Sequence, residues 1–319
     1  MSHLADSLRW SPLDGTPLYE AQGHVVCSGW HEGRWFPLQL SHHWGTPLFA
    51  DSAIFICSFS NLVIGPPLES EYHSYTIVHS SEAMDKRVAI VTGGAVGLGR
   101  EIAIALSGSD CRVCVNYHSS HVAAAKLIEE LGDNVIAMRA DVCKRDEVLA
   151  MVDRVVDKWG RMDIVVNNAG ITKDALIVKQ SEEDWDSVMA VHVKGLFNLV
   201  QTCVPRMNNG GHIINISSYS GLKGNKGQAA YSSSKAALLG LTKSAAIELA
   251  ARDVKVNAVL PGYMPTGMGS IAASALERAR EESLLHTLSD PCEVARFIVY
   301  LSTTKTITGQ TFVFDSRIV

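Results

Sequence analysis

From residue 86 onward, short apolar runs alternate with longer segments of helical spacing, and this alternation most restricts the possible fold. The runs are rich in Val and Ile and read RVAIVTG, RVCVNY, NVIAMRA, DIVVNNAG, HIINISS and VKVNAVLPG. Continuous apolar runs of this kind are typical of parallel strands that are buried on both faces. Strands that alternate with helices predict an α/β domain in which a parallel sheet lies between two helical layers. A last strand is expected over Gln310–Asp315, so we assign residues 84–319 to one domain.

The charge and the apolar content of the chain argue against several classes of protein. The 319 residues are 47% hydrophobic and carry a formal net charge of −5, which provides no basic surface for nucleic acid. The best apolar stretch, Ser52–Gly65, is interrupted by polar residues and is shorter than the roughly 20 residues that a membrane span needs. The N-terminus lacks a basic segment followed by an apolar core, so no secretory signal is expected. We expect no nucleic-acid partner and no membrane association.

The seven cysteines are scattered and lack the paired spacing of a metal site. Cys111 and Cys114 form a CxxC, but both fall within an expected strand, which favours packing over a redox or metal role. A reducing compartment is the simplest setting for an odd number of such cysteines. We therefore expect no metal and a cytoplasmic location.

Composition changes sharply near residue 84. Residues 1–83 hold two basic and eight acidic residues, a formal charge of −6, whereas residues 84–319 hold 26 basic and 25 acidic residues. Neither helical nor strand periodicity persists in residues 1–83 beyond short pieces such as SAIFICSF. This extension has three interpretations: a poorly ordered segment, a small partner-binding appendage, or a stretch upstream of a true start at Met84. We favour poor order or a misassigned start.

Three glycines follow the first expected strand of the domain and precede an expected helix. Gly93, Gly97 and Gly99 are spaced G-x-x-x-G-x-G in TGGAVGLGREIAIAL. Small residues let the backbone turn tightly and approach a pyrophosphate, and the free N–H groups at the helix start attract its negative charge. The spacing differs from the usual G-x-G-x-x-G, and a purely structural turn is the alternative. The strand before and the helix after favour a dinucleotide site.

The end of the second expected strand indicates which dinucleotide binds. An Asp or Glu there would hydrogen-bond the ribose 2′-hydroxyl of NAD, but the sequence reads VNYHSSH without an acidic residue. Asn116, His118 and Ser119 are instead available to donate to a 2′-phosphate, and Arg100 follows the last glycine. We expect NADPH, with NADH as the alternative because no arginine stands at the decisive position itself.

Tyr231 and Lys235 stand four residues apart in the helix-forming stretch AAYSSSKAA. This spacing places both side chains on one face of a helix, close enough to share a ligand. From this stretch alone, a solvated helix face is an equally good interpretation.

Five motifs, in one order, resemble those of the short-chain dehydrogenase/reductase family, and most closely its beta-ketoacyl carrier-protein reductase branch. They are TGGAVGLG, ADV, NNAG, NISS with YSSSK, and PGYMPT. The resemblance covers residues 84–319 and implies a single Rossmann-type, doubly wound α/β domain, whereas residues 1–83 have no counterpart in the family core. It also implies a homotetramer or homodimer, formed through the helix that carries Tyr231 and its neighbour.

Together with the residues above, the resemblance implies a set of cofactor-binding residues. The full set is Thr92, Gly93, Gly97, Leu98, Gly99, Asn116, His118, Ser119, Asp141, Val142, Asn167, Ala169, Gly170, Tyr231, Lys235, Pro261, Gly262 and Thr266. Within this set, Asp141 is expected at the adenine, Asn167 at the adenosine ribose and Thr266 at the nicotinamide end.

The resemblance also implies the catalytic roles: Tyr231 as acid, Lys235 as ligand of the cofactor ribose, and Ser218 as the hydroxyl that orients the carbonyl. Ser217 is the neighbouring candidate, but the step from Ser218 to Tyr231 fits the family better. A ketone that accepts hydride develops negative charge on its oxygen and needs a proton donor within about 3 Å. An ordinary tyrosine pKa near 10 is too high for this work, and we expect the Lys235 ammonium to lower it.

His192 departs from the family pattern. Many members carry an asparagine in a V-N-x-x-G context on the helix after NNAG, where it supports a water linked to the lysine. Here the stretch reads AVHVKG, and His192 occupies that position. A neutral imidazole donates from one nitrogen and accepts at the other. We hypothesise that His192 is catalytic, retaining the relay and adding a proton acceptor; the alternative is that it only packs.

The residues expected to recognise an acidic carrier protein also depart from the family. Such recognition relies on basic residues near the entrance. Arg252 matches one such position, whereas Asn209 falls where a carrier-binding arginine would be, leaving Arg206 and Lys223 as further candidates. Residues 267–290 cover the expected substrate lid, and the C-terminal DSRIV differs from the glycine-rich ending common in the family.

We predict an NADPH-dependent reductase of 3-oxoacyl thioesters, with acyl carrier protein as carrier and fatty acid biosynthesis as setting. One alternative is another alcohol/ketone pair, such as a coenzyme A thioester, a polyol or a steroid. The alternative from another class is a non-catalytic NADP-binding scaffold with residues 1–83 as its interaction arm. The intact set Ser218, Tyr231 and Lys235 argues against the scaffold.

Overall fold

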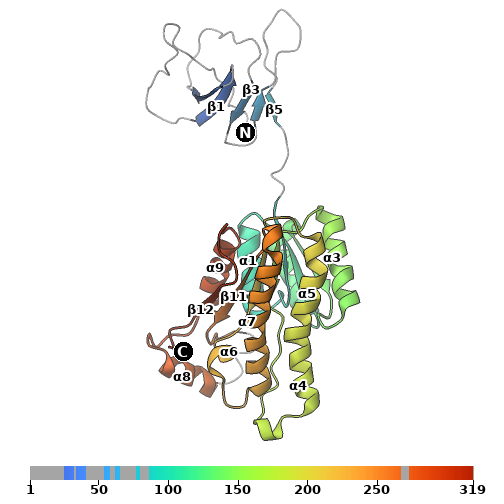
Figure 1. Ribbon diagram of the computed structural model, residues 1–319, viewed down its shortest axis with the longest axis vertical. Coiled ribbons are helices and arrows are strands. Elements are labelled where there is room, and N and C mark those ends of the chain that lie inside the picture. The colour runs from blue at the N-terminus through green and yellow to red at the C-terminus, as the bar shows by residue number, and fades with distance from the viewer. Residues whose placement is uncertain are drawn as a thin grey trace, which may run out of the picture. The chain divides into compact units, whose positions relative to one another are not determined.

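The computed structural model describes residues 25–31, 34–40, 54–57, 62–64, 77–79, 86–266 and 273–318 (Figure 1). The chain divides into two compact units, Met1–Asp85 and Lys86–Val319. In the first unit, an antiparallel sheet has the strand order β2-β1-β3-β4-β5. Its strands are β1 (Val25–His31), β2 (Arg34–Leu40), β3 (Ile54–Cys57), β4 (Leu62–Ile64) and β5 (Ile77–His79).

These strands lie in the extension, where the sequence analysis found periodicity only in short pieces. The described strands are short, and only the third one coincides with an apolar piece noted in the sequence, SAIFICSF. The interpretation of poor order or a misassigned start falls largely on residues outside the described ones, and it stays a prediction.

The second unit is built on a seven-stranded sheet with the order β12-β11-β10-β9-β6-β7-β8. Every neighbouring pair is parallel. The strands are β6 (Val88–Val91), β7 (Arg112–Tyr117), β8 (Val135–Arg139), β9 (Ile164–Asn167), β10 (His212–Ile216), β11 (Lys255–Pro261) and β12 (Thr311–Phe314). The predicted doubly wound parallel sheet is therefore confirmed, and each strand falls in an apolar run that the sequence marked.

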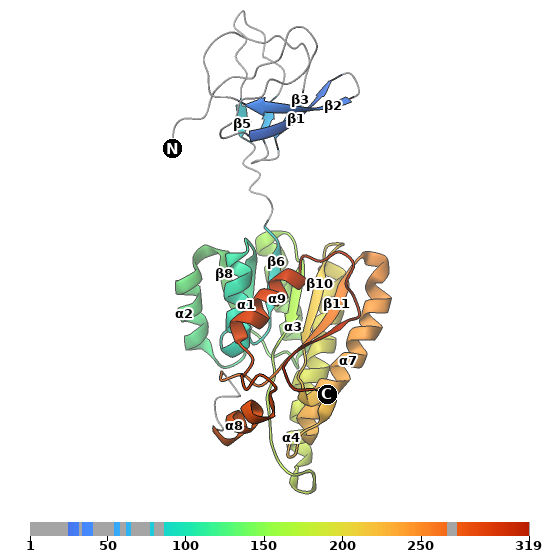
Figure 2. The same ribbon diagram turned by 90° about the vertical axis from the view of Figure 1, so that its left-hand side faces the viewer.

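Helices cover both faces of this sheet (Figures 1 and 2). Helices α1, α2 and α9 contribute to the core on one face, and α3, α5 and α7 to the core on the other. The helices of the domain are α1 (Gly97–Gly108), α2 (His121–Leu131), α3 (Arg145–Trp159), α4 (Glu182–Met189), α5 (Gly195–Cys203), α6 (Ser220–Lys223), α7 (Ala229–Leu249), α8 (Ala273–Glu282) and α9 (Pro291–Leu301). Single turns of 3₁₀-helix, η1 (Gly132–Asn134), η2 (Ile177–Lys179), η4 (Val204–Arg206) and η5 (Ala250–Arg252), and one π-helical turn, η3 (Ala190–Lys194), complete it.

The strands read as continuous apolar runs because both of their faces are buried. In β6, Ala89 and Val91 pack into one core while Val88 and Ile90 pack into the other, as the two-residue repeat of a strand requires. The CxxC obeys the same rule, since its first and second cysteines belong to opposite cores. The two thiols therefore lie on different sides of the sheet, in agreement with the packing role expected for them.

The chain reverses its direction of winding between β6 and β9. Strands β7 and β8 continue the sheet on one side of β6, and β9 to β12 continue it on the other. In open sheets of this kind, a crevice forms at the carboxyl ends of the strands where the order reverses, and ligands bind there. The loop after β6 and the loop after β9 meet at this point, because the Asn168 and Ala169 amides donate to the Thr92 hydroxyl, both at 3.0 Å.

One helical run is more apolar than the sequence analysis recognised. Residues Glu182–Arg206 form a continuous 25-residue helical stretch with a window of mean hydropathy 1.2, which by length and composition alone is sufficient to cross a membrane. Within the domain, 44% of that window is buried. Leu199 and Cys203, both on α5, are part of the hydrophobic core. Packing within the domain accounts for these buried apolar residues, whereas Phe197 in the same stretch is exposed.

Asp163 holds the amino ends of three strands together. Asp163 is 7% exposed. Its carboxylate accepts hydrogen bonds from the backbone amide of Val88 at 2.8 Å, from the Arg161 guanidinium at 2.7 Å and from the side-chain amide of Asn208 at 3.0 Å. Replacing Asp163 with Ala should lower the free energy of unfolding by about 3 kcal/mol, because buried donors lose their acceptor. Urea denaturation measures this loss.

The matched control is Asp153→Ala, which removes a carboxylate that pairs with Arg206 at the surface, where the two side chains are 45% and 33% exposed. Its loss should stay below about 1 kcal/mol. Equal losses in the two variants would contradict the role assigned to Asp163.

Candidate active site

A cleft of about 980 Å³ lies at the carboxyl ends of the strands and brings together most of the predicted site residues. Its walls come from the glycine turn, the ends of β7 and β8, the loop after β9, helix α7 and the loop after β11. The predicted residues that line it are Gly93, Gly97, Leu98, Gly99, Asn116, His118, Ser119, Asp141, Val142, Ala169, Gly170, Ser218, Tyr231, Lys235, Pro261, Gly262 and Thr266. Thr92, Asn167 and His192 are buried behind this wall.

The glycine turn leads from β6 into α1 and has the geometry of an anion cradle. Gly93 has a φ of +61°, a conformation that a side chain would strain. A Cβ at Gly99 would collide with the Gly93 carbonyl oxygen, so the helix can pack this closely on the turn only with glycine there. No side chain caps the first turn of α1, which leaves its N–H groups directed at the cleft and able to bind a pyrophosphate.

Thr92 organises the loop after β9 from behind the wall. Its hydroxyl oxygen accepts from the amides of Asn168 and Ala169, both at 3.0 Å, and the Asn168 side chain donates to the Thr92 carbonyl at 2.9 Å. Asn168 therefore faces the cleft, whereas Asn167 is the buried last residue of β9. Of the two adjacent asparagines, the structure thus places Asn168 at the cleft wall and the expected Asn167 behind it.

The end of β7 differs from the expected phosphate site. The side chain of Asn116 is engaged by the backbone, accepting from the Gly93 amide at 3.4 Å and donating to the Ala140 carbonyl at 2.9 Å. Arg100 is ion-paired with Glu101 and Glu130. These two predicted phosphate donors are therefore occupied within the protein.

His118 and Ser119 remain exposed at the cleft rim. Beside them lies Arg139, the last residue of β8, whose Nε donates to the His118 carbonyl at 3.2 Å. This guanidinium was not predicted from the sequence. Arg139 lies on the strand next to β7, where it is paired with Tyr117. The strand order needed to find it comes from the fold.

The loop after β8, where the adenine is expected, lines the cleft through Asp141 and Val142. Asp141 accepts from the Cys143 amide at 2.9 Å, which holds the loop in a tight turn. Asn198 of α5, a second residue missed in the sequence, donates to the carbonyls of Val142 and Cys143 at 2.9 and 3.1 Å. This side of the cleft is therefore fixed by a buried amide.

The opposite end of the cleft is formed by the loop after β11. The Gly262 amide donates to the Phe314 carbonyl at 2.9 Å and to the Ser289 hydroxyl at 3.0 Å. The Thr266 hydroxyl oxygen is buried, lines the cleft and has no hydrogen-bond partner among the described residues. Buried polar atoms are normally satisfied, so an unpartnered hydroxyl at this place fits the carboxamide of a nicotinamide. The cradle at one end and Thr266 at the other fit a dinucleotide as a whole.

The two serines at the end of β10 have different environments. The Ser217 hydroxyl donates to the Lys235 carbonyl at 2.7 Å and is buried. Ser218 lies half-buried at the cleft, accepts from the Ser220 amide at 3.2 Å, and its side chain lowers the pKa of the nearby Tyr231. The structure therefore places Ser218 where a carbonyl group can be held, and Ser217 where it anchors α7.

Tyr231 and Lys235 lie on the same side of α7, with Nζ 5.7 Å from the centre of the tyrosine ring. Lys235 is 3% exposed, donates to the Ile216 carbonyl at 2.8 Å, and burial lowers its pKa to about 8. Burial raises the pKa of Tyr231 above its ordinary value, although the hydrogen bond with Ser218 lowers it. The expected lowering by Lys235 is therefore absent from the protein alone, where loss of hydration dominates.

Both ring nitrogens of His192 are engaged. Nε2 accepts from the Ile171 amide at 3.0 Å, so the ring proton must sit on Nδ1. Nδ1 donates at 2.6 Å to the Ser234 hydroxyl, which in turn donates to the Tyr231 carbonyl at 2.7 Å. Burial, together with the nearby Lys235, lowers the pKa of His192 to about 2. This pattern favours the packing interpretation over a titrating relay.

Most of the basic residues proposed for carrier recognition lie at the other edge of the sheet. Arg252 and Asn209 come directly before β11 and β10, at the amino ends of those strands, and Arg252 donates to the carbonyls of Val204 and Met207. Arg206 pairs with Asp153 on α3. Of the three basic candidates, only Lys223 lines the cleft. Within one subunit, Arg252 and Arg206 therefore lie away from the cleft, whereas Lys223 lies at it.

A family model described as Enoyl-(Acyl carrier protein) reductase matches residues 93–316. A 3-oxoacyl-(acyl-carrier-protein) reductase of Staphylococcus epidermidis is 41% identical over 231 residues, which are 70% of this chain and 95% of the relative. The enzyme of the same name from Thermotoga maritima is 39% identical over 246 residues, 74% of this chain and 99% of the relative.

Solved structures agree with these similarities. A variant of the short-chain dehydrogenase/reductase of Serratia marcescens superposes with a TM-score of 0.69 at 31% identity, covering 72% of this chain and 96% of its own. A dehydrogenase/reductase of Sinorhizobium meliloti gives a TM-score of 0.70 at 32% identity, covering 72% and 94%.

The neutral, buried state of His192 makes a prediction for stability at acid pH. Below pH 6.5 the unfolded chain protonates this histidine, whereas the folded chain does so only near pH 2. The unfolded state then binds the extra proton, so stability falls as pH falls. Between pH 7 and 5 the free energy of unfolding should drop by about 2 kcal/mol more in the natural protein than in His192→Asn. Urea denaturation at pH 7, 6 and 5 measures both, and parallel pH dependences would show that His192 titrates normally in the fold.

Proposed function

The chain belongs to the short-chain dehydrogenase/reductase family, and we propose that it uses NADPH to reduce the 3-oxo group of an acyl thioester to a hydroxyl group. The observation that carries this proposal is the meeting of Ser218, Tyr231 and Lys235 at one wall of the cleft that also contains the glycine turn. The similarity to reductases of 3-oxoacyl-(acyl-carrier-protein) supports the substrate class. Fatty acid biosynthesis in the cytoplasm is the setting we propose.

In this mechanism the protein holds the ketone and delivers a proton. A bound nicotinamide supplies the hydride to C3. Ser218 donates its hydroxyl hydrogen to the carbonyl oxygen and orients it toward Tyr231, and Tyr231 transfers its phenolic proton to that oxygen as the C–O bond becomes single. The raised pKa keeps Tyr231 protonated and ready to donate. The ammonium of Lys235 then favours the phenolate that is left behind.

The carrier of the acyl group is part of the proposal. Acyl carrier protein is supported by the names of the relatives, while coenzyme A presents the same thioester chemistry. Lys223, which lines the cleft, is the basic residue from the original set that we place at the entrance. The alternative retained from the sequence is another alcohol/ketone pair, such as a polyol or steroid. The description of the matching family model adds a second alternative, reduction of an enoyl thioester.

We propose NADPH in preference to NADH because no acidic residue ends β7 and because Arg139 lies beside His118. A guanidinium at this rim suits a 2′-phosphate, which it can bind through charge-assisted hydrogen bonds. The exposed polar side chains of His118 and Ser119 add donors.

We also propose a homotetramer or homodimer formed through α7 and its neighbour α5. Large apolar side chains are exposed on both helices, Phe197 on α5 and Ile247 on α7. A contact between subunits through these two helices would remove both side chains from water.

Substitution of the proposed acid tests the function. Tyr231→Phe should lower kcat for reduction of an acetoacetyl thioester at least about 100-fold, because the proton donor is lost, while NADPH binding measured by nucleotide fluorescence stays within about twofold. The panel includes carrier-linked and coenzyme A-linked acetoacetyl, a crotonyl thioester and small ketones. Undiminished turnover in Tyr231→Phe would favour the scaffold, and turnover of crotonyl alone would favour enoyl reduction.

Substitution of Arg139 tests the choice of cofactor. Arg139→Gln should raise KM for NADPH about tenfold and leave KM for NADH unchanged, because one charge-assisted hydrogen bond to the 2′-phosphate is removed. Arg154→Gln, an exposed arginine of α3 away from the cleft, is the matched control and should change neither constant. An equal effect of Arg139→Gln on both cofactors would argue against a 2′-phosphate contact.

A further inference from the structure

We propose that Arg317 is a positioning residue of the reduction site, which acts through two contacts. Through Tyr219 it holds the turn that carries Ser218, and through Glu282 it holds the end of helix α8 at the substrate side of the cleft. The inference rests on the proposed reduction at Ser218, and it concerns a C-terminal segment that departs from the family pattern.

Arg317 follows β12 and is itself held in a fixed orientation. Its side chain is 13% exposed and lines the cleft. Its Nε donates to both carboxylate oxygens of Asp315, at 3.0 and 2.9 Å, and its Nη2 bonds the same carboxylate. This paired carboxylate neutralises the guanidinium and fixes its plane. The rigid group is therefore available to pack against its neighbours.

The first contact is with Tyr219, the residue after Ser218. The guanidinium carbon lies 4.2 Å from the centre of the Tyr219 ring, a stacking distance. The ring is 4% exposed, and its hydroxyl donates to the Ile318 carbonyl at 2.9 Å. The C-terminal segment thus contacts Tyr219 twice, at the face of its ring and at its hydroxyl. These contacts limit movement of the backbone that presents Ser218.

The second contact is with α8, which lines the substrate side of the cleft through Ala275, Arg278 and Ala279. Its last residue, Glu282, lies 3.5 Å from Nη1 of Arg317 and 4.0 Å from Nζ of Lys223.

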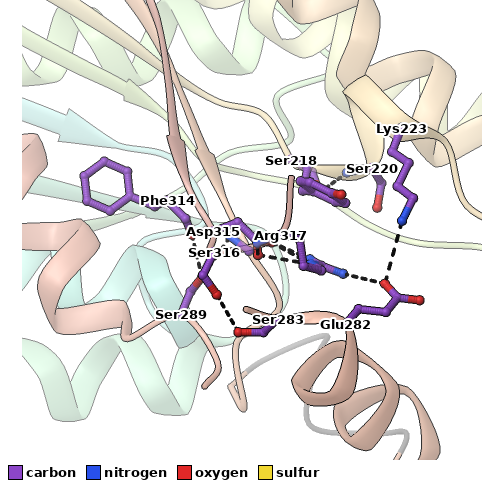
Figure 3. A network of polar contacts seen from close by, with 12 residues as sticks. Ser218, Ser220, Lys223, Glu282, Ser283, Ser289, Phe314, Asp315, Ser316 and Arg317 are labelled. Carbon is purple, nitrogen blue, oxygen red and sulfur yellow. Dashed lines mark hydrogen bonds and ion pairs between the residues drawn. The ribbon is translucent and has the colours of Figure 1, made fainter. Parts of the chain in front are cut away.

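The chain just after α8 is tied to the same segment, as Figure 3 shows. The hydroxyls of Ser283 and Ser316 hydrogen-bond each other, and the Leu284 amide donates to the Ser316 carbonyl at 3.4 Å. The end of α8 is therefore attached to the C-terminal segment by an ion pair and by hydrogen bonds.

Loss of each contact should have a different kinetic effect. A catalytic hydroxyl displaced by about 1 Å costs up to roughly 100-fold in rate, so loosening Tyr219 should lower kcat. Release of α8 opens the substrate side without moving Ser218, so it should raise KM for the ketone. Arg317 takes part in both contacts, whereas Glu282 takes part only in the second.

The experiment compares three variants under saturating NADPH. Arg317→Met, which keeps the length and removes the planar charge, should lower kcat about 10- to 30-fold and raise KM for acetoacetyl thioester about fivefold. Glu282→Gln should raise that KM about fivefold with kcat within about twofold. Arg280→Met, an exposed arginine on α8 that pairs with Glu277, is the matched control and should leave both constants unchanged.

Two further readouts distinguish positioning from a general loss of structure. NADPH-binding stoichiometry should be the same in all variants, and Arg317→Lys, which keeps the charge without the planar stack, should restore KM more than kcat. If Arg317→Met does not fold, Tyr219→Phe, which removes only the hydroxyl bond to Ile318, should lower kcat about threefold with KM unchanged. Natural kcat and KM in Arg317→Met, or a fall in kcat matched by lost NADPH binding, would overturn the proposal.

Hydrogen exchange keeps the second contact testable without turnover. Amides of residues 275–286 should exchange about tenfold faster in both Arg317→Met and Glu282→Gln than in Arg280→Met. Unchanged exchange would overturn the role at α8. A natural protein that reduces no ketone would instead contradict the proposed function, while the exchange result would still report on Arg317.

Discussion

The site depends on a seam of buried polar contacts between the end of β10 and helix α7. Ser217 donates to the Lys235 carbonyl at 2.7 Å, Lys235 donates to the Ile216 carbonyl at 2.8 Å, and Asn215 donates to the Thr242 hydroxyl at 2.9 Å. Buried polar groups are costly when unpaired, so the helix can rotate or slide only by breaking these bonds. The seam thereby fixes the position of α7, and with it Tyr231, relative to the Ser218 turn.

This arrangement places a charge where water is scarce. The ammonium of Lys235 donates to the backbone carbonyl of Ile216, and burial lowers its pKa to about 8. Burial shifts the pKa of the neighbouring Tyr231 in the opposite direction and raises it, because a phenolate is also poorly hydrated there. Perturbed groups of this kind gather at functional sites. The environment keeps Tyr231 protonated, and it allows Lys235 to lose its proton at mildly alkaline pH.

Two departures from the family pattern anchor the same catalytic elements by different means. His192 joins the loop after β9 to α7 through Ser234, and its ring contacts that of Tyr231 edge-on at 5.4 Å between centres. Arg317 contacts the other catalytic segment through Tyr219. In both places a larger side chain supplies rigid, directed contacts, which suits the proposed reduction, in which two hydroxyl groups must be held in position.

The sequence alone determined the α/β class, the strands and the glycine turn, because burial on both faces and tight turns leave direct marks on residue type. It also indicated Ser218, Tyr231 and Lys235, whose spacing along the chain reflects one strand end and one helix. Tertiary structure alone decided that Asn168 and not Asn167 faces the cleft, and that the side chain of Asn116 is occupied by the backbone. The contacts of Arg139, Arg252 and Arg317 likewise follow from which strands are neighbours and at which edge each side chain lies. Local spacing carries no such information, since these partners are brought together only when the sheet forms.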